Sequence, residues 1–210
     1  MKTPLFRLAV FLLCLPAMSA LAQREGFDTT VTRKTEITII EILAPPPQLE
    51  TAKKKKGGGT DSTERAGVKP DGSAAKVNAS KKAVVFDNLF FKLDSAELRD
   101  RASELQVDDI AAALKSAKLK DGAFLIEGHT CDIGEDEYNM KLSALRAETI
   151  RQMLIRRGIS GDRLMVLGFG EKELVESVKD GDTPAQAETK RMKSRRVVLR
   201  RLVPETTAKK

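Results

Sequence analysis

Residues 124–147, FLIEGHTCDIGEDEYNMKLSALRA, combine a short hydrophobic run, a polar turn and an amphipathic segment. The hydrophobic run at 123–126 has the length of a buried strand, and Gly128 and Gly134 follow it where the backbone needs a close approach or a positive φ. The next segment opens with acidic residues, which favour the first turn of a helix because unpaired N–H groups there carry partial positive charge. The stretch therefore predicts a strand, a turn and a helix over residues 135–157.

Polar side chains gather where this strand meets this helix. Asn139, Ser143 and Arg146 are spaced by four and three residues, which places them on one face of the helix near its start. The preceding turn adds Glu127, His129, Thr130 and Asp132. We expect a small polar pocket of carboxylates, amides, hydroxyls and one guanidinium at this junction.

The same residues form a motif, and three further segments fall in order around it. The motif consists of Gly128-His129-Thr130, Gly134, Asn139, Leu142-Ser143 and Arg146-Ala147, and the flanking segments are 91–98, 164–171 and 193–198. Together they resemble the peptidoglycan-binding OmpA-like domain, which also occurs in the lipoprotein Pal and in flagellar stator proteins. Each segment alone is a weak signal, but four in order over about 120 residues make a strong one.

The resemblance implies an α+β fold, a two-layer sandwich of order βαβαββ with helices on one face of a mixed sheet. The alternation of hydrophobic runs with longer amphipathic segments fits this order. We expect one domain over 83–204, with strands at 84–91, 123–127, 164–167 and 195–202, helices at 96–118 and 135–157, and a short helix at 185–192.

The resemblance also implies a ligand, the peptide stem of peptidoglycan, held by the free amino-acid end of diaminopimelate. In this interpretation Arg146 holds the ligand carboxylate through two parallel hydrogen bonds, and a side-chain carboxylate holds the ligand ammonium. In the family that acid directly follows Gly-His-Thr, whereas this sequence has a cysteine there and an aspartate one residue later. Either that aspartate or one on the turn after the first strand would then supply the acid. The candidate ligand-binding residues are Arg146, Asp132, Asn139, Thr130, Asp94 and Cys131.

Other roles for these residues stay open. Arg146 and Asp132 would also suit an ion pair that only braces the loop against the helix. His129 and Cys131 are too few for a tetrahedral zinc site unless carboxylates complete it, and as a nucleophile pair they lack a clear orienting third group. We therefore expect no metal, no cofactor and no catalysis, with a cysteine-dependent hydrolase as the enzymatic alternative.

Two arginines precede the last expected strand. Arg195 and Arg196 resemble a pair of arginines that the family has at this point. A ligand contact and a solvated or ion-paired edge are both consistent with them.

The first 22 residues have the features of a secretory signal. They combine a basic start, a hydrophobic stretch at 8–18 and Ala-Leu-Ala at 20–22. The stretch falls short of the ~20 residues of a membrane-spanning helix, so we expect cleavage and export to the periplasm. Cys14 leaves with the signal, and the mature chain then keeps Cys131 alone and forms no intramolecular disulfide.

Residues 23–82 are expected to lie outside the domain. Glu36–Leu43, EITIIEIL, has the β-branched content of a strand, and the prolines at 45–47 end it. Residues 51–82 are rich in Lys, Gly, Ser and Thr and predict a flexible tether, because they bury too little surface to offset the entropy of ordering. A lone strand needs a partner, so an alternative function is an adaptor whose N-terminal segment pairs with another envelope protein.

The distribution of charge separates the expected domain from its flanks. The formal net charge is +7, yet acidic and basic side chains balance over 83–204, so the excess lies in the extension and in the tail at 205–210. Aromatic residues make up 4% of the chain, and a neutral domain with few aromatics does not fit a nucleic-acid-binding protein. We expect a non-enzymatic, periplasmic module of a Gram-negative envelope that binds peptidoglycan and associates with the outer membrane.

Overall fold

The computed structural model describes residues 34–45 and 61–203. Its elements are the helices α1 (Glu36–Leu43), α2 (Arg101–Lys115), α3 (Asp136–Arg156) and α4 (Pro184–Ser194), the 3₁₀ turn η1 (Gly161–Arg163), and the strands β1 (Ser62–Val68), β2 (Ala74–Phe86), β3 (Phe124–Gly128), β4 (Leu164–Gly168) and β5 (Val197–Leu202). The expected signal at 1–22 and the tail at 205–210 lie outside the described residues. Within the described part, no helix is both long enough and hydrophobic enough to cross a bilayer.

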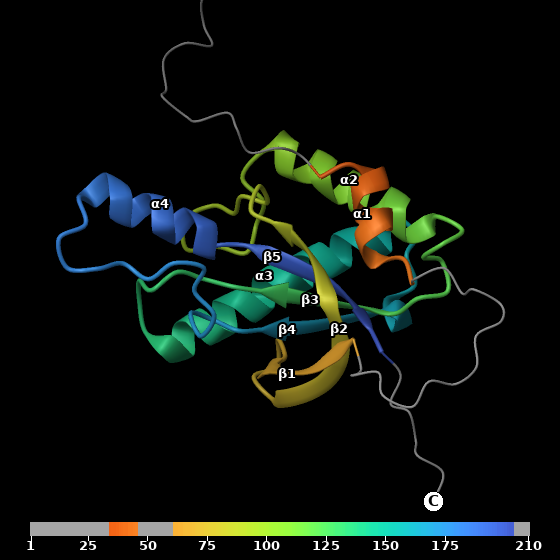
Figure 1. Cartoon of the computed structure of the whole chain (residues 1–210), viewed down its shortest axis with the longest axis horizontal. Coiled ribbons are helices and arrows are strands. Elements are labelled where there is room, and N and C mark those ends of the chain that lie inside the picture. Colours follow the sequence, from red (N-terminus) through yellow and green to blue (C-terminus); the bar gives the residue numbers. More distant parts are fainter. Residues whose placement is uncertain (1–33, 46–60, 204–210) are drawn as a thin grey trace, which may run out of the picture. The chain divides into compact units, whose positions relative to one another are not determined.

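The five strands form one mixed sheet in the order β1-β2-β5-β3-β4 (Figure 1). β3 pairs in parallel with β4 and antiparallel with β5, and β5 pairs antiparallel with β2. The sheet curls until β1 meets β4 at the single pair Val68 and Gly168. The expected α+β fold with a mixed sheet is therefore confirmed, and the hairpin of β1 and β2 extends that sheet.

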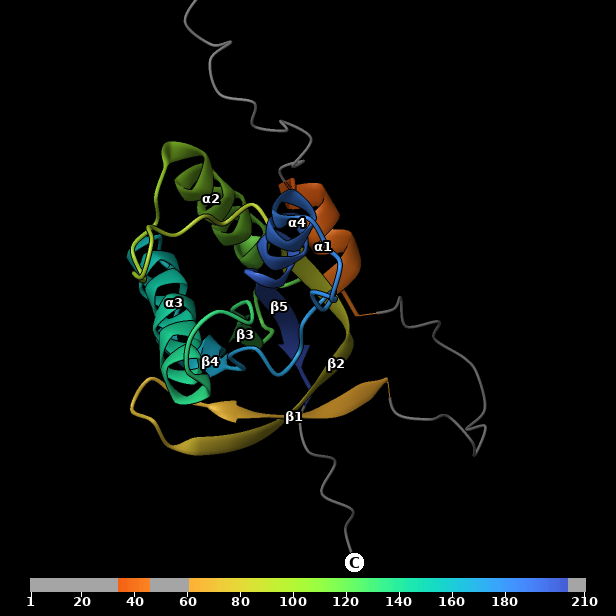
Figure 2. The same ribbon diagram turned by 90° about the vertical axis from the view of Figure 1, so that its left-hand side faces the viewer.

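β3 is buried on both of its faces, because two hydrophobic cores lie on opposite sides of the sheet. Phe124 and Ile126 belong to the main core, which α2 and α3 cover (Figure 2). Leu125, which points the other way, packs with Leu167 and Phe169 in a smaller core that side chains of β2 complete. Helices α1, α2 and α3 therefore cover one face of the sheet, and the β1–β2 hairpin covers part of the other.

Glu36–Leu43 is a helix, so the prediction of a strand there is wrong. Its residues Ile39 and Leu43, four apart, are both buried against the main core, and burial of two such side chains contributes about 1.5–3 kcal/mol each. The buried amide of Gln106 in α2 bonds the backbone N–H and C=O of Lys34, each at 2.7 Å. Packing thus overrides the strand propensity of the β-branched residues.

Because Glu36–Leu43 is a helix packed on the core, it cannot add a strand to the sheet of another protein, and the adaptor hypothesis loses its basis.

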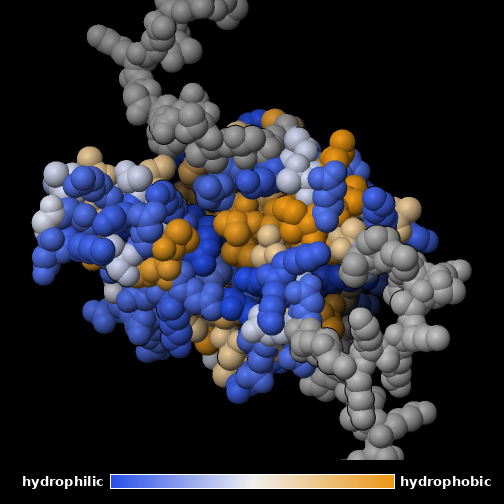
Figure 3. All heavy atoms as spheres, viewed as in Figure 1, coloured by the Kyte–Doolittle hydropathy of each residue, from blue (hydrophilic) through white to orange (hydrophobic). Residues whose placement is uncertain are grey.

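Figure 3 shows that hydrophobic side chains gather on this face of the molecule in the region of α1 and the neighbouring end of the sheet. Two exposed hydrophobic residues of these elements are Ile37 on α1 and Val85 on β2.

Residues 61–82 are ordered, so the prediction of a flexible tether over 51–82 is wrong for this part; residues 46–60 lie outside the described residues. β1 and β2 pair along the whole length of β1, from Ser62 opposite Ser80 to Val68 opposite Ala74. Small residues such as Ala79 fill the thin second core. The tether prediction rested on composition, in which alanine counts as only weakly hydrophobic, so it overlooked this core. The expected domain boundary at residue 83 falls inside β2.

The helix predicted at 96–118 is α2, which begins later than expected, at Arg101 rather than at residue 96. Asp100 caps it, since its carboxylate accepts hydrogen bonds from the backbone N–H of Ser103 at 2.9 Å and from its hydroxyl at 2.8 Å. Before this cap the chain folds back on itself through a bridge between Phe91 and Leu98. The predicted strand at 84–91 correspondingly ends at Phe86.

A buried ionic network fastens the hairpin to the rest of the sheet. Glu127 on β3 is fully buried and accepts hydrogen bonds from Arg65 on β1 at 2.7 and 3.1 Å and from Arg200 on β5 at 3.0 and 3.2 Å. Arg65 also bonds Glu173 twice at 2.8 Å and lies over the ring of Phe169, 4.5 Å from its centroid. Burial would raise the pKa of Glu127, but the contact with His129, the hydrogen bonds from Arg65 and the positive charges of Arg200 and Arg65 hold it below its ordinary value.

Replacement of Arg65 with methionine should destabilise the protein strongly. The change leaves the buried carboxylate of Glu127 with only part of its counter-charge, and breaking a buried pair costs about 3–5 kcal/mol. We expect a loss of about 3 kcal/mol in the free energy of unfolding, measured by urea denaturation with circular dichroism.

Lys76→Met is the matched control in the same hairpin. The side chains of Lys76 and its partner Glu64 are 69% and 61% exposed, so its loss should change the free energy of unfolding by less than about 1 kcal/mol. Equal effects of the two substitutions would show that the buried network does not fasten the hairpin.

Candidate functional site

The ends of β3 and β4 lie directly against the backbone of α3. A Cβ on Gly128 would come within 2.0 Å of the carbonyl oxygen of Ser143, and one on Gly168 within 2.5 Å of the backbone nitrogen of Ala144. The hydroxyl of Ser143 also accepts a hydrogen bond from the backbone N–H of Gly170 at 2.9 Å. The close approach expected at Gly128 is therefore present, and it holds the start of α3 beside the two strand ends.

Asn139 holds the loop between β3 and α3 in shape. This buried residue donates hydrogen bonds from its amide to the carbonyl of Ile133 at 3.1 Å and to the carboxylate of Glu171 at 2.8 Å. Gly134 lies next to this amide and has a φ of +104°, as the sequence predicts. The side-chain amide of Asn139 is thus committed to the protein itself.

Arg146 is a buried cation that forms no ion pair with a carboxylate of residues 34–45 or 61–203. It is 8% exposed, its Nε donates to the carbonyl of Ser95 at 3.0 Å, and its guanidinium lies 5.1 Å from the ring centroid of Phe91. Its two terminal nitrogens donate no hydrogen bond to any described residue. Burial lowers the pKa of Arg146, and the positive charge of Arg195 lowers it further. A guanidinium in this state presents an unused pair of donors to an anion.

Asp94 lies on the turn that precedes α2, close enough to Arg146 for their charges to interact. It adopts a φ of +51°, and its exposed carboxylate accepts a hydrogen bond through Oδ1 from the hydroxyl of Tyr138 on α3. Its Oδ2 has no hydrogen-bond partner within 34–45 and 61–203. Asp94 is therefore a free acceptor at the edge of the arginine site.

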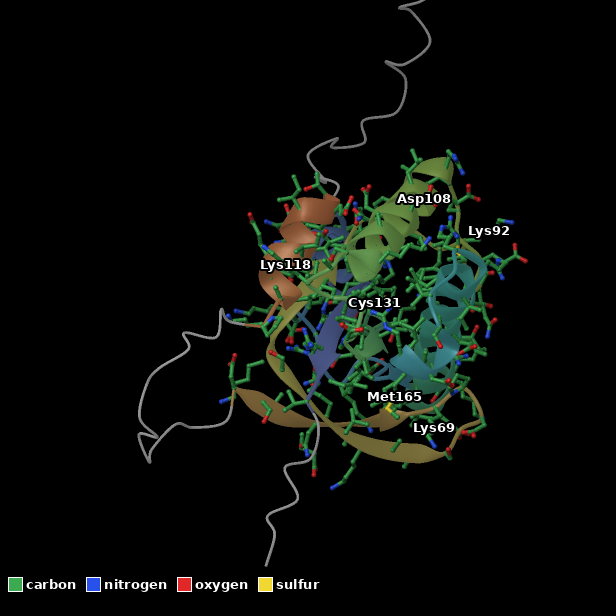
Figure 4. The ribbon with its side chains drawn as sticks, turned by 90° about the vertical axis from the view of Figure 1, so that its right-hand side faces the viewer. Lys69, Lys92, Asp108, Lys118, Cys131 and Met165 are labelled. Carbon is green, nitrogen blue, oxygen red and sulfur yellow. The ribbon has the colours of Figure 1, made fainter. Side chains whose placement is uncertain are left out.

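Cys131 occupies the position where the family resemblance places an acid. It is 7% exposed, and Figure 4 shows it in the interior of the ribbon. Its sulfur accepts a hydrogen bond from Nη1 of Arg195 at 3.5 Å, while the other terminal nitrogen of Arg195 donates to Glu188. The corner beside Arg146 thus contains a second guanidinium and a thiol.

Asp132 is engaged elsewhere. Its carboxylate accepts hydrogen bonds from Nε and Nη2 of Arg191 on α4, at 2.7 and 3.4 Å. The hydrogen bond from Arg191 holds the pKa of Asp132 below its ordinary value. The ion pair between Asp132 and Arg146 that the sequence left open is therefore absent among the described contacts, and Asp132 braces the loop against α4 instead.

The two arginines before β5 point to different neighbours. Arg195 faces Cys131, whereas Arg196 donates to the carbonyls of Glu173 at 3.0 Å and Ser194 at 3.2 Å. Only Arg195 belongs to the site around Arg146.

His129 and Thr130 are buried behind the strand end. The ring of His129 stacks on Phe169 at 5.3 Å between centroids, and its Nε2 lies 3.8 Å from a carboxylate oxygen of Glu127. Thr130 donates its backbone N–H to the carbonyl of Gly170 at 2.9 Å. Cys131 instead faces Arg195. The side chains of His129 and Cys131, the alternative nucleophile pair, therefore have different neighbours.

The sequence did not single out several residues that shape this site: Phe91, Ser95, Tyr138, Glu171 and Arg191. Phe91, Ser95 and Glu171 lie within the quoted motif segments, so the motif carried a signal for them. The contact of Arg191 with Asp132 joins residues 59 positions apart, and no local pattern indicates such a pair.

Comparisons with known proteins agree with this architecture. A model of the OmpA family matches residues 90–191. The peptidoglycan-associated lipoprotein of Pseudomonas putida is 30% identical over 155 residues, which cover 69% of this chain and 85% of that protein. Outer membrane protein A of Serratia marcescens is 29% identical over 96 residues, 46% of this chain and 26% of that protein.

A solved structure is also similar. The crystal structure of the peptidoglycan-associated lipoprotein from Burkholderia pseudomallei matches with a TM-score of 0.44 and 26% identity, covering 54% of this chain and 87% of that one. Coverage of the relatives differs widely, since the chain spans only about a quarter of the outer membrane protein A it matches.

The buried His129 should make stability depend on pH between about 7 and 5. Burial lowers the pKa of His129 in the folded protein, so the unfolded chain, with an ordinary pKa near 6.5, binds more protons in this range. The free energy of unfolding should therefore fall as the pH drops, by at most about 1.4 kcal/mol per pH unit. Urea denaturation at several pH values measures this slope.

His129→Gln is the test variant, because this is the only histidine in the sequence. The pKa values of the neighbouring acids Glu127 and Glu173 are lowered, so these groups titrate below this range. The variant should show a nearly flat profile from pH 7 to 5. An unchanged slope would assign the pH dependence to another group.

Proposed function

Because the chain belongs to the OmpA family, we propose that it binds peptidoglycan non-covalently, through the free carboxylate of a diaminopimelate-containing stem peptide. The ligand carboxylate lies on Arg146 at the junction of β3, β4 and α3. The protein acts without catalysis as a periplasmic module that tethers or organises the cell envelope.

The state of Arg146 is the observation that carries this proposal. A buried cation is costly unless it is paired, and within the described residues the terminal nitrogens of Arg146 bond nothing. A carboxylate would accept two parallel hydrogen bonds from them and replace the lost hydration. The backbone carbonyl of Ser95 and the ring of Phe91 hold the guanidinium in place for this contact.

The remaining candidates have distinct proposed roles. Asp94, steadied by Tyr138, offers a solvent-exposed acceptor to the polar groups that flank the ligand carboxylate. Asn139 and Thr130 shape the pocket from behind, because both are buried and bond the loop or its neighbours. Asp132 positions α4, and with it the following Arg195, through its bonds to Arg191.

Substitution of Arg146 by lysine should weaken binding to purified sacculi and to stem peptide at least tenfold. Lysine keeps the charge but loses the planar pair of donors, and hydrogen bonds to charged groups contribute about 1.5–3 kcal/mol. Calorimetric titration with the peptide and sedimentation with sacculi measure the loss.

Arg156→Lys is the matched control, because Arg156 is an exposed arginine of the same helix. It should leave the affinity unchanged. Unaltered binding by Arg146→Lys, with both variants folded by circular dichroism, would contradict the proposed site.

Substitution of Asp132 by asparagine should leave the affinity for the peptide within about threefold, because its carboxylate is occupied by Arg191. The partly exposed pair contributes about 1 kcal/mol or less to stability. A loss of affinity as large as that of Arg146→Lys would show that Asp132 leaves Arg191 and contacts the ligand directly.

A further inference from the structure

Arg201 on β5 occupies a position where the pattern of the strand calls for a hydrophobic residue. Val197 and Leu199, at alternate positions of the same strand, both belong to the main core, and alternate residues of a strand point to the same face. Arg201 is the next residue of this row, and it pairs with Phe124, another residue of the main core. Its side chain therefore lies on the helix-covered face, at the end of the sheet opposite to the candidate ligand site.

The guanidinium of Arg201 has no partner in the part of the chain that the structure describes. Its Nη1 is buried without a hydrogen bond, and neither Nε nor Nη2 donates one to any residue of 34–45 or 61–203. Its central carbon lies against Gly122, where an added Cβ would come within 3.3 Å of it. A partly buried, unbonded cation costs free energy, and a break of this kind in the hydrophobic pattern is expected at a functional site.

A second guanidinium lies beside the first. Arg163, in η1, donates from Nε to the carbonyl of Gly122 at 2.8 Å, and from Nη2 to one carbonyl in α2 and one just beyond it, at 3.0 and 2.8 Å. Its Nη1 donates no hydrogen bond within the described residues. Burial lowers the pKa of Arg163, Asp121 raises it, and the charge of Arg201 lowers it. The two arginines are therefore close enough to repel each other.

Acidic side chains offset only part of this charge. The loop 116–123 and η1 contain two acids, Asp121 and Asp162, and both are exposed. The carboxylate of Asp121 is 85% exposed and lies 3.9 Å from the ammonium of Lys120. The same loop adds Lys118, another exposed cation (Figure 4). Four cations therefore face two solvated acids at this end of the sheet.

We propose that Arg201 and Arg163 form an anion site that binds a phosphate group, carried by a lipid headgroup or free in solution. A phosphate accepts hydrogen bonds at several oxygens at once, so it suits the unused nitrogens of two neighbouring guanidinium groups. Its negative charge offsets their repulsion and supplies the partner that Arg201 lacks. Lys118 and Lys120 flank the site and attract an anionic surface over a longer distance.

The site is separate from the one in the proposed function. Arg201 lies beside Phe124 at the start of β3, whereas Arg146 lies beyond Gly128 at the other end of that strand. A peptidoglycan ligand and a phosphate-bearing surface therefore approach the protein from opposite ends, and neither competes with the other.

Arg201→Gln is the test variant, because this side chain bonds nothing in the described residues and its replacement should leave the protein folded. Arg156→Gln is the matched control, since it removes the same charge from an exposed arginine at the end of α3, at the same end of the molecule. The full mature chain is sedimented at low salt with vesicles of phosphatidylglycerol and phosphatidylcholine, or of phosphatidylcholine alone. It is also titrated calorimetrically with inorganic phosphate.

The unmodified protein and Arg156→Gln should bind the phosphatidylglycerol vesicles, and Arg201→Gln should bind them about tenfold more weakly. Binding of inorganic phosphate without binding of vesicles, again lost in Arg201→Gln, supports the site and identifies free phosphate as its ligand. Equal losses in both variants would show a diffuse attraction of charges and overturn the site, as would absence of binding to both probes. Arg201→Gln should bind the stem peptide as the unmodified protein does, so failure of this inference is distinguishable from failure of the proposed function.

Discussion

The buried carboxylate of Glu127 is the interaction on which the rest of the structure depends. It lies at the end of β3, the strand that is buried on both faces, and it requires positive charge from both sides. Arg200 comes from the neighbouring β5, but Arg65 comes from β1, which pairs with β3 nowhere in the sheet. One desolvated acid therefore obliges the hairpin to fold back over the sheet. The same strand end then continues, two residues later, into the loop that contains the candidate site.

The two sides of this strand end have opposite electrostatic states. Toward the hairpin, arginines and glutamates satisfy one another in a closed network. Toward α3, Arg146 is buried with its terminal nitrogens unused within the described residues. The glycines at the ends of β3 and β4 allow the backbone of α3, the helix that contains Arg146, to pack directly against both strand ends. The closed network around Glu127 thus fixes the strand end, and the donors of Arg146 beside it stay available for a ligand.

The sequence predicted the elements whose local pattern and tertiary packing agree. The strand before Gly128, the long helix that contains Arg146 and the strand at 164–167 were all found because hydrophobic period, caps and glycines indicate the same structure. The strand prediction for Glu36–Leu43 was wrong. Its β-branched residues favour a strand, but a helix buries Ile39 and Leu43 and lets Gln106 bond the backbone of Lys34. The hairpin was not predicted because it contributes only Ala75, Val77 and Ala79 to the second core, too few hydrophobic residues to stand out in a Lys- and Ser-rich segment. In the site, motif residues were predictable, but the partner of Asp132 depends on a contact between distant segments.

The docking of α1 has a mechanical consequence for a chain that is held at two points. Tension between a ligand on Arg146 and the chain at Lys34 would pass through α3, the main core and α2 before it reaches the two bonds of Gln106. α1 is attached by few buried side chains, whereas the hairpin is attached by a ladder and an ionic network. α1 therefore yields first, and unwinding its eight residues lengthens the chain by roughly 15 Å. Under tension α1 would unwind and lengthen while the sheet and the binding pocket remain folded.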